Sequence, residues 1–473
     1  MDKLLFILLL TLSLLCRAEG LPDLGDVSQA TVSPQQERQI GEQSMLEIRA
    51  DKSYLDDAEI GDYLNQLGYQ LVANSSEPGQ AFEFFAINDN AINAFALPGG
   101  FVGVNTGLIL TTQSESELAS VLSHEIAHVT QHHLARMVAG QKIDSLASMA
   151  AVAVAILAAR SNPEASQAAI VGVQAGAIQR QLNFTRTHEQ EADRLGLETL
   201  QKAGFDTHAM PAFLERLQKA TRLLEGNAPS YLRTHPVTSE RVADIASRVQ
   251  QIPYRLVASS LSFHLVRAKL QVMQKTPQEA AAFFSDALGA QKHGDQIAQR
   301  YGLVLALLRG DQPARAAQEF AALNKQTTQN PMIATLAGQI MRAGKNHQEA
   351  IEFYRTATQN FPQHRALAYD YAGLLLQGKR FEDALKLLNE QIIGHPNDPR
   401  LYELQAEAYA ALGKRQDEHH ALAYTYVLRG NLRGAIEQLE LAKQAGSDYY
   451  QLSIIESELK QFREIAAAHN KKN

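Results

Sequence analysis

The chain has 473 residues, of which 45% are hydrophobic and 20% are charged, and this is the composition of an ordinary globular protein. A chain of this length has enough apolar material for two or three packed domains. The formal net charge is -7 and the basic residues are scattered along the sequence. This charge pattern lacks the basic face that binding to nucleic acid requires, so nucleic acid is an unsuitable partner.

The first residues have the three-part pattern of a secretory signal. A basic Lys3 precedes an apolar run from Leu4 to Leu15, and the small Ala18 follows. We expect cleavage after Ala18, which makes residues 1–18 a signal peptide and places the mature protein in a bacterial periplasm. A retained anchor and a lipid on Cys16 are the alternatives. Cys16 is the only cysteine of the chain, so the expected mature form has no thiol nucleophile and no disulfide of its own.

Residues 33–250 are predicted to form an α+β domain that begins with two helices and a short β region. Ser33 is a suitable N-cap for the first helix, and the second helix ends near residue 75. Apolar and aromatic segments at 82–87, 93–97 and 101–105 follow as predicted strands. A long helix then begins after Ser114, with Glu117 at the spacing of a capping box, and covers the sequence SESELASVLSHEIAHVTQHHLARM.

The motif HEIAH in that helix carries the clearest chemistry. His124 and His128 lie one turn apart on the same helical face, so both imidazoles can reach one metal ion. Glu125 projects beside that face, where a water molecule on the metal would lie. The pattern therefore predicts two metal ligands and a catalytic base.

A catalytic zinc ion needs a third protein ligand and an open fourth position. A metzincin would place its third histidine where this chain has Leu134, so that class is excluded. Three ligands on successive turns of one straight helix would spread too widely around the metal. We therefore interpret His132 and His133 as residues on the helix surface or as supports for the ligands.

The segment TRTHEQEAD offers a better third ligand. Glu189 can reach the metal from a second helix, and Asp193 one turn later can hold a ligand histidine in the correct tautomer. Glu191 faces another side of that helix and is interpreted as an exposed carboxylate.

The run Leu146–Ala159 is apolar but only fourteen residues long, which is short of the roughly twenty residues that a membrane-spanning helix needs. We favour a buried helix of the catalytic domain. A lid and a membrane-surface segment are the alternatives that the sequence leaves open.

Residues 262–465 are predicted to form an all-α solenoid of tetratricopeptide repeats. A glycine, an alanine and a proline each recur with a period of 34 residues, and a large apolar residue follows each alanine by four positions. An earlier unit around Ala280 and degenerate units near Gly413 and Gly430 extend the array. We expect a curved solenoid whose concave face holds a partner or rests against the protease. The markers are Gly310, Gly344 and Gly378, Ala316, Ala350 and Ala384, Pro362 and Pro396, and Phe320, Tyr354 and Leu388.

Four blocks resemble, in order, the signature of the CAAX-prenyl-protease-like zinc metallopeptidases: NAFALPGG, GLILTTQSESELASVLSHEIAHV, RTHEQEAD and RTHPVTSER. They cover most of residues 35–245. The resemblance implies a gluzincin fold in which His124, His128 and Glu189 bind one zinc ion per subunit and Glu125 is the base. The spanning helices of the membrane-bound relatives have no counterpart in this sequence.

The order of leader, peptidase domain and repeats resembles a family of periplasmic proteases of Gram-negative bacteria. That resemblance implies chaperone-like assistance to outer-membrane β-barrel proteins, degradation of unfolded or misassembled ones, and contact with the barrel assembly machinery through the repeats. Contact with the membrane would be peripheral. The alternative is a non-proteolytic binding module with a latent or structural zinc site, and the intact Glu125 favours the enzyme. The strand at 101–105 is predicted to hold an extended substrate by edge pairing.

His235, in the block RTHPVTSER, has three interpretations. It begins a helix and is held structurally by Pro236, or it occupies the fourth zinc position as a latch that displaces the catalytic water. The third interpretation is a direct catalytic role, in which His235 and Arg241 stabilise the oxyanion.

Overall fold

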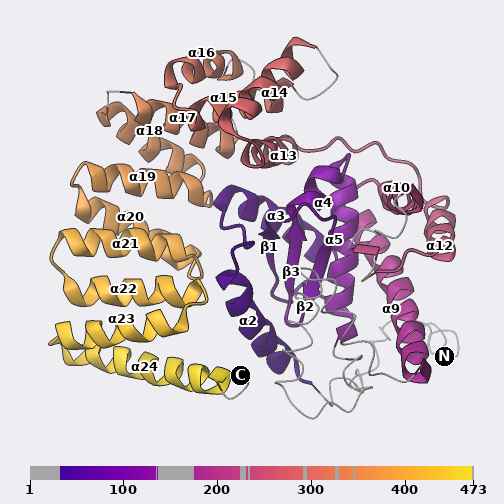
Figure 1. The fold of residues 1–473 in the computed structure, drawn as a ribbon, viewed down its shortest axis with the longest axis horizontal. Helices are drawn as coiled ribbons and strands as arrows, with labels where there is room; N and C mark the ends of the chain where they lie inside the picture. The colour runs from indigo at the N-terminus through magenta and orange to yellow at the C-terminus, as the bar shows by residue number, and fades with distance from the viewer. Residues whose placement is uncertain are drawn as a thin grey trace, which may run out of the picture.

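A computed structural model describes residues 32–134, 136, 175–223, 231–232, 235–290, 296–324, 330–344 and 347–470. The predicted signal peptide and the run Leu146–Ala159 lie outside the described residues. Figure 1 shows a small sheet enclosed by helices, with further helices stacked in a curved column along one side. Within the described ranges, no helix is long and apolar enough to cross a membrane.

The first half of the chain forms the expected α+β unit. Ser33 caps the first helix, because its side chain accepts from the backbone N–H of Gln36 while the Gln36 side chain accepts from the backbone N–H of Ser33. Ser114 likewise accepts from the backbone N–H of Glu117. The elements are α2 (Pro34–Ala50), α3 (Ala58–Val72), β1 (Glu83–Ile87), β2 (Ala94–Leu97), β3 (Phe101–Asn105), α4 (Thr106–Thr111), α5 (Glu115–Thr130), α9 (Ala175–Lys202), α10 (Ala209–Leu223) and α12 (Ser239–Val249).

The sheet has the strand order β1-β3-β2, with β3 parallel to β1 and antiparallel to β2. The expectation that the strand at 101–105 binds substrate by edge pairing is therefore wrong, because β3 is the central strand and is paired on both sides. The outer side of β1 is also covered. The Asn65 amide donates to the carbonyl of Phe84 and accepts from its N–H, and the Tyr69 hydroxyl donates to the carbonyl of Phe82. β2 is the other edge strand of the described sheet.

The second half of the chain consists of antiparallel helix pairs, as the 34-residue period predicts. The recurring alanines pack where paired helices approach, and Ala316, Ala350 and Ala384 are each 0% exposed. The helices are α13 (Leu261–Met273), α14 (Pro277–Gly289), α15 (Gln296–Arg309), α16 (Pro313–Asn324), α17 (Pro331–Ala343), α18 (His347–Asn360), α19 (Arg365–Gln377), α20 (Phe381–Gly394), α21 (Pro399–Ala411), α22 (Arg415–Leu428), α23 (Leu432–Ala445) and α24 (Tyr449–Asn470).

The apolar core is continuous from the peptidase half into the first repeats. Buried side chains of α3 and β1, such as Leu64 and Phe84, belong to the same cluster as Phe263 of α13 and Leu336 of α17. Polar contacts add to this, since Lys269 of α13 lies 2.7 Å from carboxylate oxygens of both Asp57 and Glu59.

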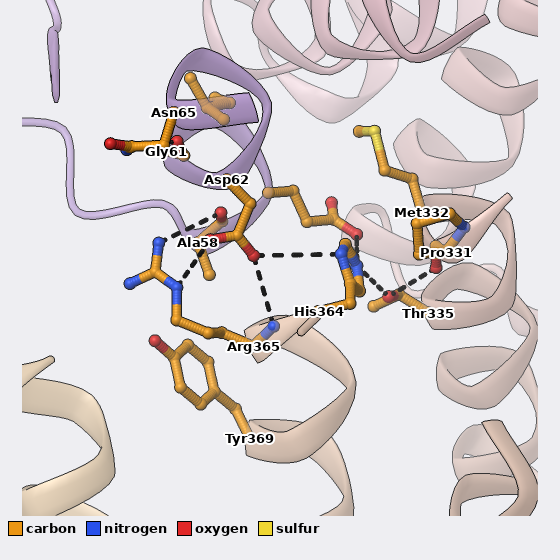
Figure 2. Close-up of polar contacts among 12 residues, drawn as sticks. Ala58, Gly61, Asp62, Asn65, Pro331, Met332, Thr335, His364, Arg365 and Tyr369 are labelled. Carbon is orange, nitrogen blue, oxygen red and sulfur yellow. Dashed lines mark hydrogen bonds and ion pairs between the residues drawn. The ribbon is translucent and has the colours of Figure 1, made fainter. Parts of the chain in front are cut away.

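Two further contacts between the later repeats and the peptidase half are clear among the described residues. At the first place, Arg365 donates to Asp62 of α3 at 2.7 Å (Figure 2). His364, the residue before it, lies 3.3 Å from Glu59. At the second place, Gly430 in the turn before α23 has a φ of 76°, and a Cβ there would lie 2.0 Å from the carbonyl oxygen of Leu46 in α2. A groove of about 1240 Å³ is lined by both halves of the chain.

Candidate metal centre and active site

Two helices bring the predicted ligands together. α5 carries His124 and His128 on one face, and α9 carries Glu189 toward them. The helices can approach because Gly196 faces α5, where a Cβ would lie 3.1 Å from the Cα of His124. His124 and Glu189 are 1% and 2% exposed, so the site lies inside the domain.

The donor atoms converge as ligands of one small ion would. Nε2 of His124 lies 3.0 Å from Nε2 of His128 and 3.4 Å from Oε2 of Glu189. Nε2 of His128 lies 3.4 Å from Oε1 of Glu189. A tetrahedral ion with ligand bonds of about 2.0–2.1 Å requires donors roughly 3.3 Å apart, and the observed spacings are close to that value. The same group includes His235, and its four ligand atoms all lie within 4.8 Å of one another.

The charge of the site also suits a cation. Glu125, Glu189 and Asp193 are buried with one buried guanidinium, that of Arg241. With neutral histidines this leaves two excess negative charges, which a divalent ion would neutralise. Burial disfavours the charged form of His124, but its hydrogen bonds to Asp193 and Glu189 outweigh burial and raise the pKa of His124 to about 10. The metal-free pocket therefore attracts positive charge.

Glu125 lies beside the donors without joining them. It is 1% exposed, and its Oε1 atom has no hydrogen-bond partner among the described residues. Nε2 of His235 lies 3.4 Å from this oxygen. A buried carboxylate oxygen without a partner is costly, and a water molecule between Glu125 and the donors would satisfy it.

Asp193 contacts a candidate ligand histidine, as its position one turn after Glu189 predicts. Its Oδ1 lies 3.0 Å from Nδ1 of His124, which leaves Nε2 of that ring for a metal. Arg241 of α12 holds both carboxylates of α9: Nε donates to Asp193 at 2.7 Å, and Nη1 lies 2.8 Å from Glu189. The guanidinium of Arg241 is thus bound to Asp193 and Glu189, which argues against the interpretation that it stabilises an oxyanion.

His235 sits at the fourth corner of the site. Its Nδ1 lies 3.0 Å from Oε1 of Glu189 and 3.3 Å from Nε2 of His124. Tyr231, which the sequence interpretation did not include, stacks on its ring with centroids 4.8 Å apart and accepts from the backbone N–H of His235 at 2.8 Å. The imidazole is therefore held against the donor set.

The helix that carries the motif is shorter than expected. The sequence was expected to form one helix through Met137, but α5 ends at Thr130, and His132, with a φ of 48°, interrupts it. Residues 133, 134 and 136 are helical again, and Met137 lies outside the described residues. This bend changes two interpretations. His132 is bound to Glu37 of α2 at 3.0 Å, and Glu191 is bound to His133 at 3.2 Å, so Glu191 is not a simple exposed carboxylate.

Comparison with known proteins shows the family to which the chain belongs. The model of peptidase family M48 matches residues 61–249, which include all the candidate ligands, and a tetratricopeptide-repeat model matches residues 341–408. A putative beta-barrel assembly-enhancing protease of Vibrio cholerae is 36% identical over 90% of this chain and 88% of that protein. The chain belongs to the family of beta-barrel assembly-enhancing proteases, within peptidase family M48.

Two further relatives are similar to most or part of the chain. The beta-barrel assembly-enhancing protease of Escherichia coli is 34% identical over 90% of this chain and 87% of that protein. The mitochondrial metalloendopeptidase OMA1 of Schizosaccharomyces pombe is 32% identical, over 39% of this chain and 51% of its own length. The chain is thus a metallopeptidase whose M48 domain precedes tetratricopeptide repeats, which confirms the fold class expected from the sequence.

Proposed function

We propose that this protein is a zinc-dependent endopeptidase of the bacterial periplasm that acts on outer-membrane β-barrel proteins. The observation that carries the proposal is the convergence of His124, His128 and Glu189 beside the unpartnered carboxylate oxygen of Glu125. Two imidazoles and one carboxylate form a donor set that suits zinc and leaves one position open for catalysis. A purely structural site has no use for the base.

The roles of the residues follow from their positions. The chemistry that the ion supplies when bound is activation of a water molecule and polarisation of the scissile carbonyl. Glu125 would accept the proton of the attacking water at Oε1 and would pass it to the leaving amine. Asp193 fixes the tautomer of His124, and Arg241 keeps Glu189 and Asp193 ionised and aligned.

The outer side of β2 is the proposed place for an extended substrate. Ile92, just before this strand, accepts at its carbonyl from the backbone N–H of Tyr231, which stacks on His235. A peptide added beside β2 would therefore run next to the donor set. Such pairing reads the backbone and not the side chains, which suits an enzyme that removes proteins with unpaired strands.

The names of the relatives support the proposed biological role. Beta-barrel assembly-enhancing proteases cover nearly the whole chain, so we propose that this protein assists correct assembly, degrades misassembled barrel proteins and contacts the assembly machinery through its repeats. The expected signal peptide supports the periplasmic location.

The test compares wild type with Glu125→Gln. We expect both to bind one zinc ion per chain, and we expect only wild type to degrade an unfolded polypeptide, with a rate loss of about 10²–10⁴-fold in the variant. Glu198→Gln is the matched control, because Glu198 is 48% exposed on α9 and outside the site. Undiminished proteolysis by Glu125→Gln would refute the assignment of the base, and absence of zinc would refute the metal.

A further inference from the structure

The two histidines of the HEIAH motif are supported by different groups. Asp193 contacts Nδ1 of His124. Among the described residues, no carboxylate occupies the corresponding place beside His128, and its Nδ1 instead lies 2.8 Å from Nδ1 of His133. His133 in turn lies 3.2 Å, through Nε2, from Oε2 of Glu191, and Arg136 donates to the same oxygen at 3.0 Å.

This contact between His128 and His133 requires a break in the helix. Residues five positions apart on a regular α-helix point about 140° away from each other, so these two imidazoles could not meet on one. α5 ends at Thr130, and the left-handed backbone of His132, with a φ of 48°, turns the next residue back toward His128. A non-glycine residue adopts this conformation only where its surroundings hold it. The hydrogen bond between Nδ1 of His132 and Oε1 of Glu37 stabilises this conformation.

The hydrogen bonds define one consistent set of protons. If Nε2 of His128 faces the metal, Nδ1 carries the proton and donates it to Nδ1 of His133. His133 then carries its own proton on Nε2 and donates it to the Glu191 carboxylate, which Arg136 neutralises. His133 is 4% exposed and stacks on His188 with centroids 4.1 Å apart, so its ring is fixed in this orientation.

We propose that His133 and Glu191 are positioning residues for the metal ligand His128. They would fix its tautomer and ring orientation and increase the basicity of Nε2, in parallel with the action of Asp193 on His124. The inference rests on the proposed function, because it assumes that His128 binds the metal.

The test uses the full-length protein and measures three quantities for each variant. These are the dissociation constant for zinc by competition with a chelator, the unfolding temperature of the metal-free protein, and the visible spectrum of the cobalt-substituted protein. The variants are His133→Phe, which keeps a flat ring against His188 but removes the acceptor, Glu191→Gln, and the double variant. Glu198→Gln is the control on the same helix.

We expect each single variant to bind zinc about 10–100-fold more weakly, with an altered cobalt spectrum and a metal-free unfolding temperature close to that of wild type. Because the two residues act in series, the double variant should lose no more affinity than His133→Phe alone. A zinc affinity equal to that of wild type in both single variants would overturn the proposal, and so would additive losses. A parallel fall in metal-free stability would show a merely structural role. If wild type binds no zinc, the proposed function fails first, which distinguishes the two outcomes.

Discussion

Arg241 and Asp193 form a two-point ion pair in the interior: Nε lies 2.7 Å from Oδ2, Nη2 lies 2.8 Å from Oδ1, and both side chains are 2% exposed. Removing one partner of a buried pair leaves an uncompensated charge, which typically costs about 3–5 kcal/mol. We expect Arg241→Ala to lower the free energy of unfolding by this amount, measured with urea in the presence of a chelator. Arg248→Ala, exposed on the same helix, is the control and should change little. An unchanged midpoint for Arg241→Ala would contradict the role of the pair.

Metal content should separate the two carboxylates of the RTHEQEAD block. Glu189→Gln removes a charged ligand and should reduce bound zinc to a small fraction of one per chain after dialysis against a weak chelator. Glu191→Gln should keep its zinc under the same conditions, because its loss of affinity is expected to be smaller. Metal analysis of the dialysed proteins checks both. The assignment of Glu189 would be wrong if Glu191→Gln lost its metal and Glu189→Gln retained it.

The helix contact at Gly196 gives a way to disturb the site without touching a ligand. A Cβ at this position would lie 3.1 Å from both the N and Cα atoms of His124, which is backbone that cannot move aside alone. Gly196→Ala should therefore push α9 away from α5 by a few tenths of an ångström and weaken zinc binding about tenfold, by analogy with changes to groups that support ligands. Chelator competition measures the loss. A zinc affinity equal to that of wild type would show that α5 and α9 can accommodate the added methyl group without moving the ligands.

The sequence predicted the positions of residues well where a regular spacing along the chain determines them. The HEIAH motif and the four-residue spacing of Glu189 and Asp193 depend only on helical periodicity, and the structure brings these side chains together. The repeat period likewise requires only a self-similar sequence, and buried alanines such as Ala350 occur where it places them. Each of these spacings lies within one element or one repeated unit.

Features that depend on distant parts of the chain were missed. The central position of β3 follows from the pairing order of three strands, which no single segment specifies. The bend at His132 is held by Glu37, 95 residues earlier, and Arg241 reaches Asp193 across 48 residues. Helix propensity alone favours an unbroken helix across residues 130–134, and tertiary contacts override it at residues 131 and 132.

The contribution of Glu59 to stability, at the junction between the peptidase half and the repeats, should depend on pH. Burial alone would raise the pKa of Glu59, but Lys269 and His364 outweigh it and lower the pKa to about 2 from an ordinary value of 4.5. Folding thus favours the ionised form, and this stabilisation is present above about pH 4.5 and is lost as the pH falls toward 2. Glu59→Gln should be less stable than wild type at pH 7, by about 3 kcal/mol at most. The difference should shrink below pH 4.5, as urea unfolding at several pH values will show, and a constant difference would contradict this assignment.

The contribution of the repeats to this junction can be tested at Arg365. Arg365 lies 2.7 Å from both Asp62 of α3 and Asp398 of the repeats, and Tyr369 also donates to Asp398 (Figure 2 shows Arg365 with Asp62). Arg365→Ala should remove the guanidinium from two carboxylates, leaving His364 at 4.0 Å from Asp62, and lower stability by about 3 kcal/mol. It should also increase amide exchange in the first turns of α3 and α19 more than elsewhere. Exchange that rises equally throughout the chain would show that the pair does not join the two halves locally. Arg400→Ala, on the exposed face of α21, is the control.

The substitution His235→Ala distinguishes two roles of this histidine, because one predicts faster proteolysis and the other predicts slower proteolysis. Its Nδ1 lies 3.0 Å from Glu189 and 3.3 Å from Nε2 of His124, so it can complete the ligand set in the position that a catalytic water needs. We propose that this is a resting state and that His235→Ala raises the rate of proteolysis several-fold while one zinc ion stays bound. The gain should vanish when Glu125→Gln is added, because the released activity still needs the base. Degradation of an unfolded polypeptide and metal analysis of the same samples measure both effects. A fall in activity at full zinc occupancy would reject the latch and favour direct catalysis by His235, in which case Arg241 takes no part, since its guanidinium is already bound to Asp193 and Glu189.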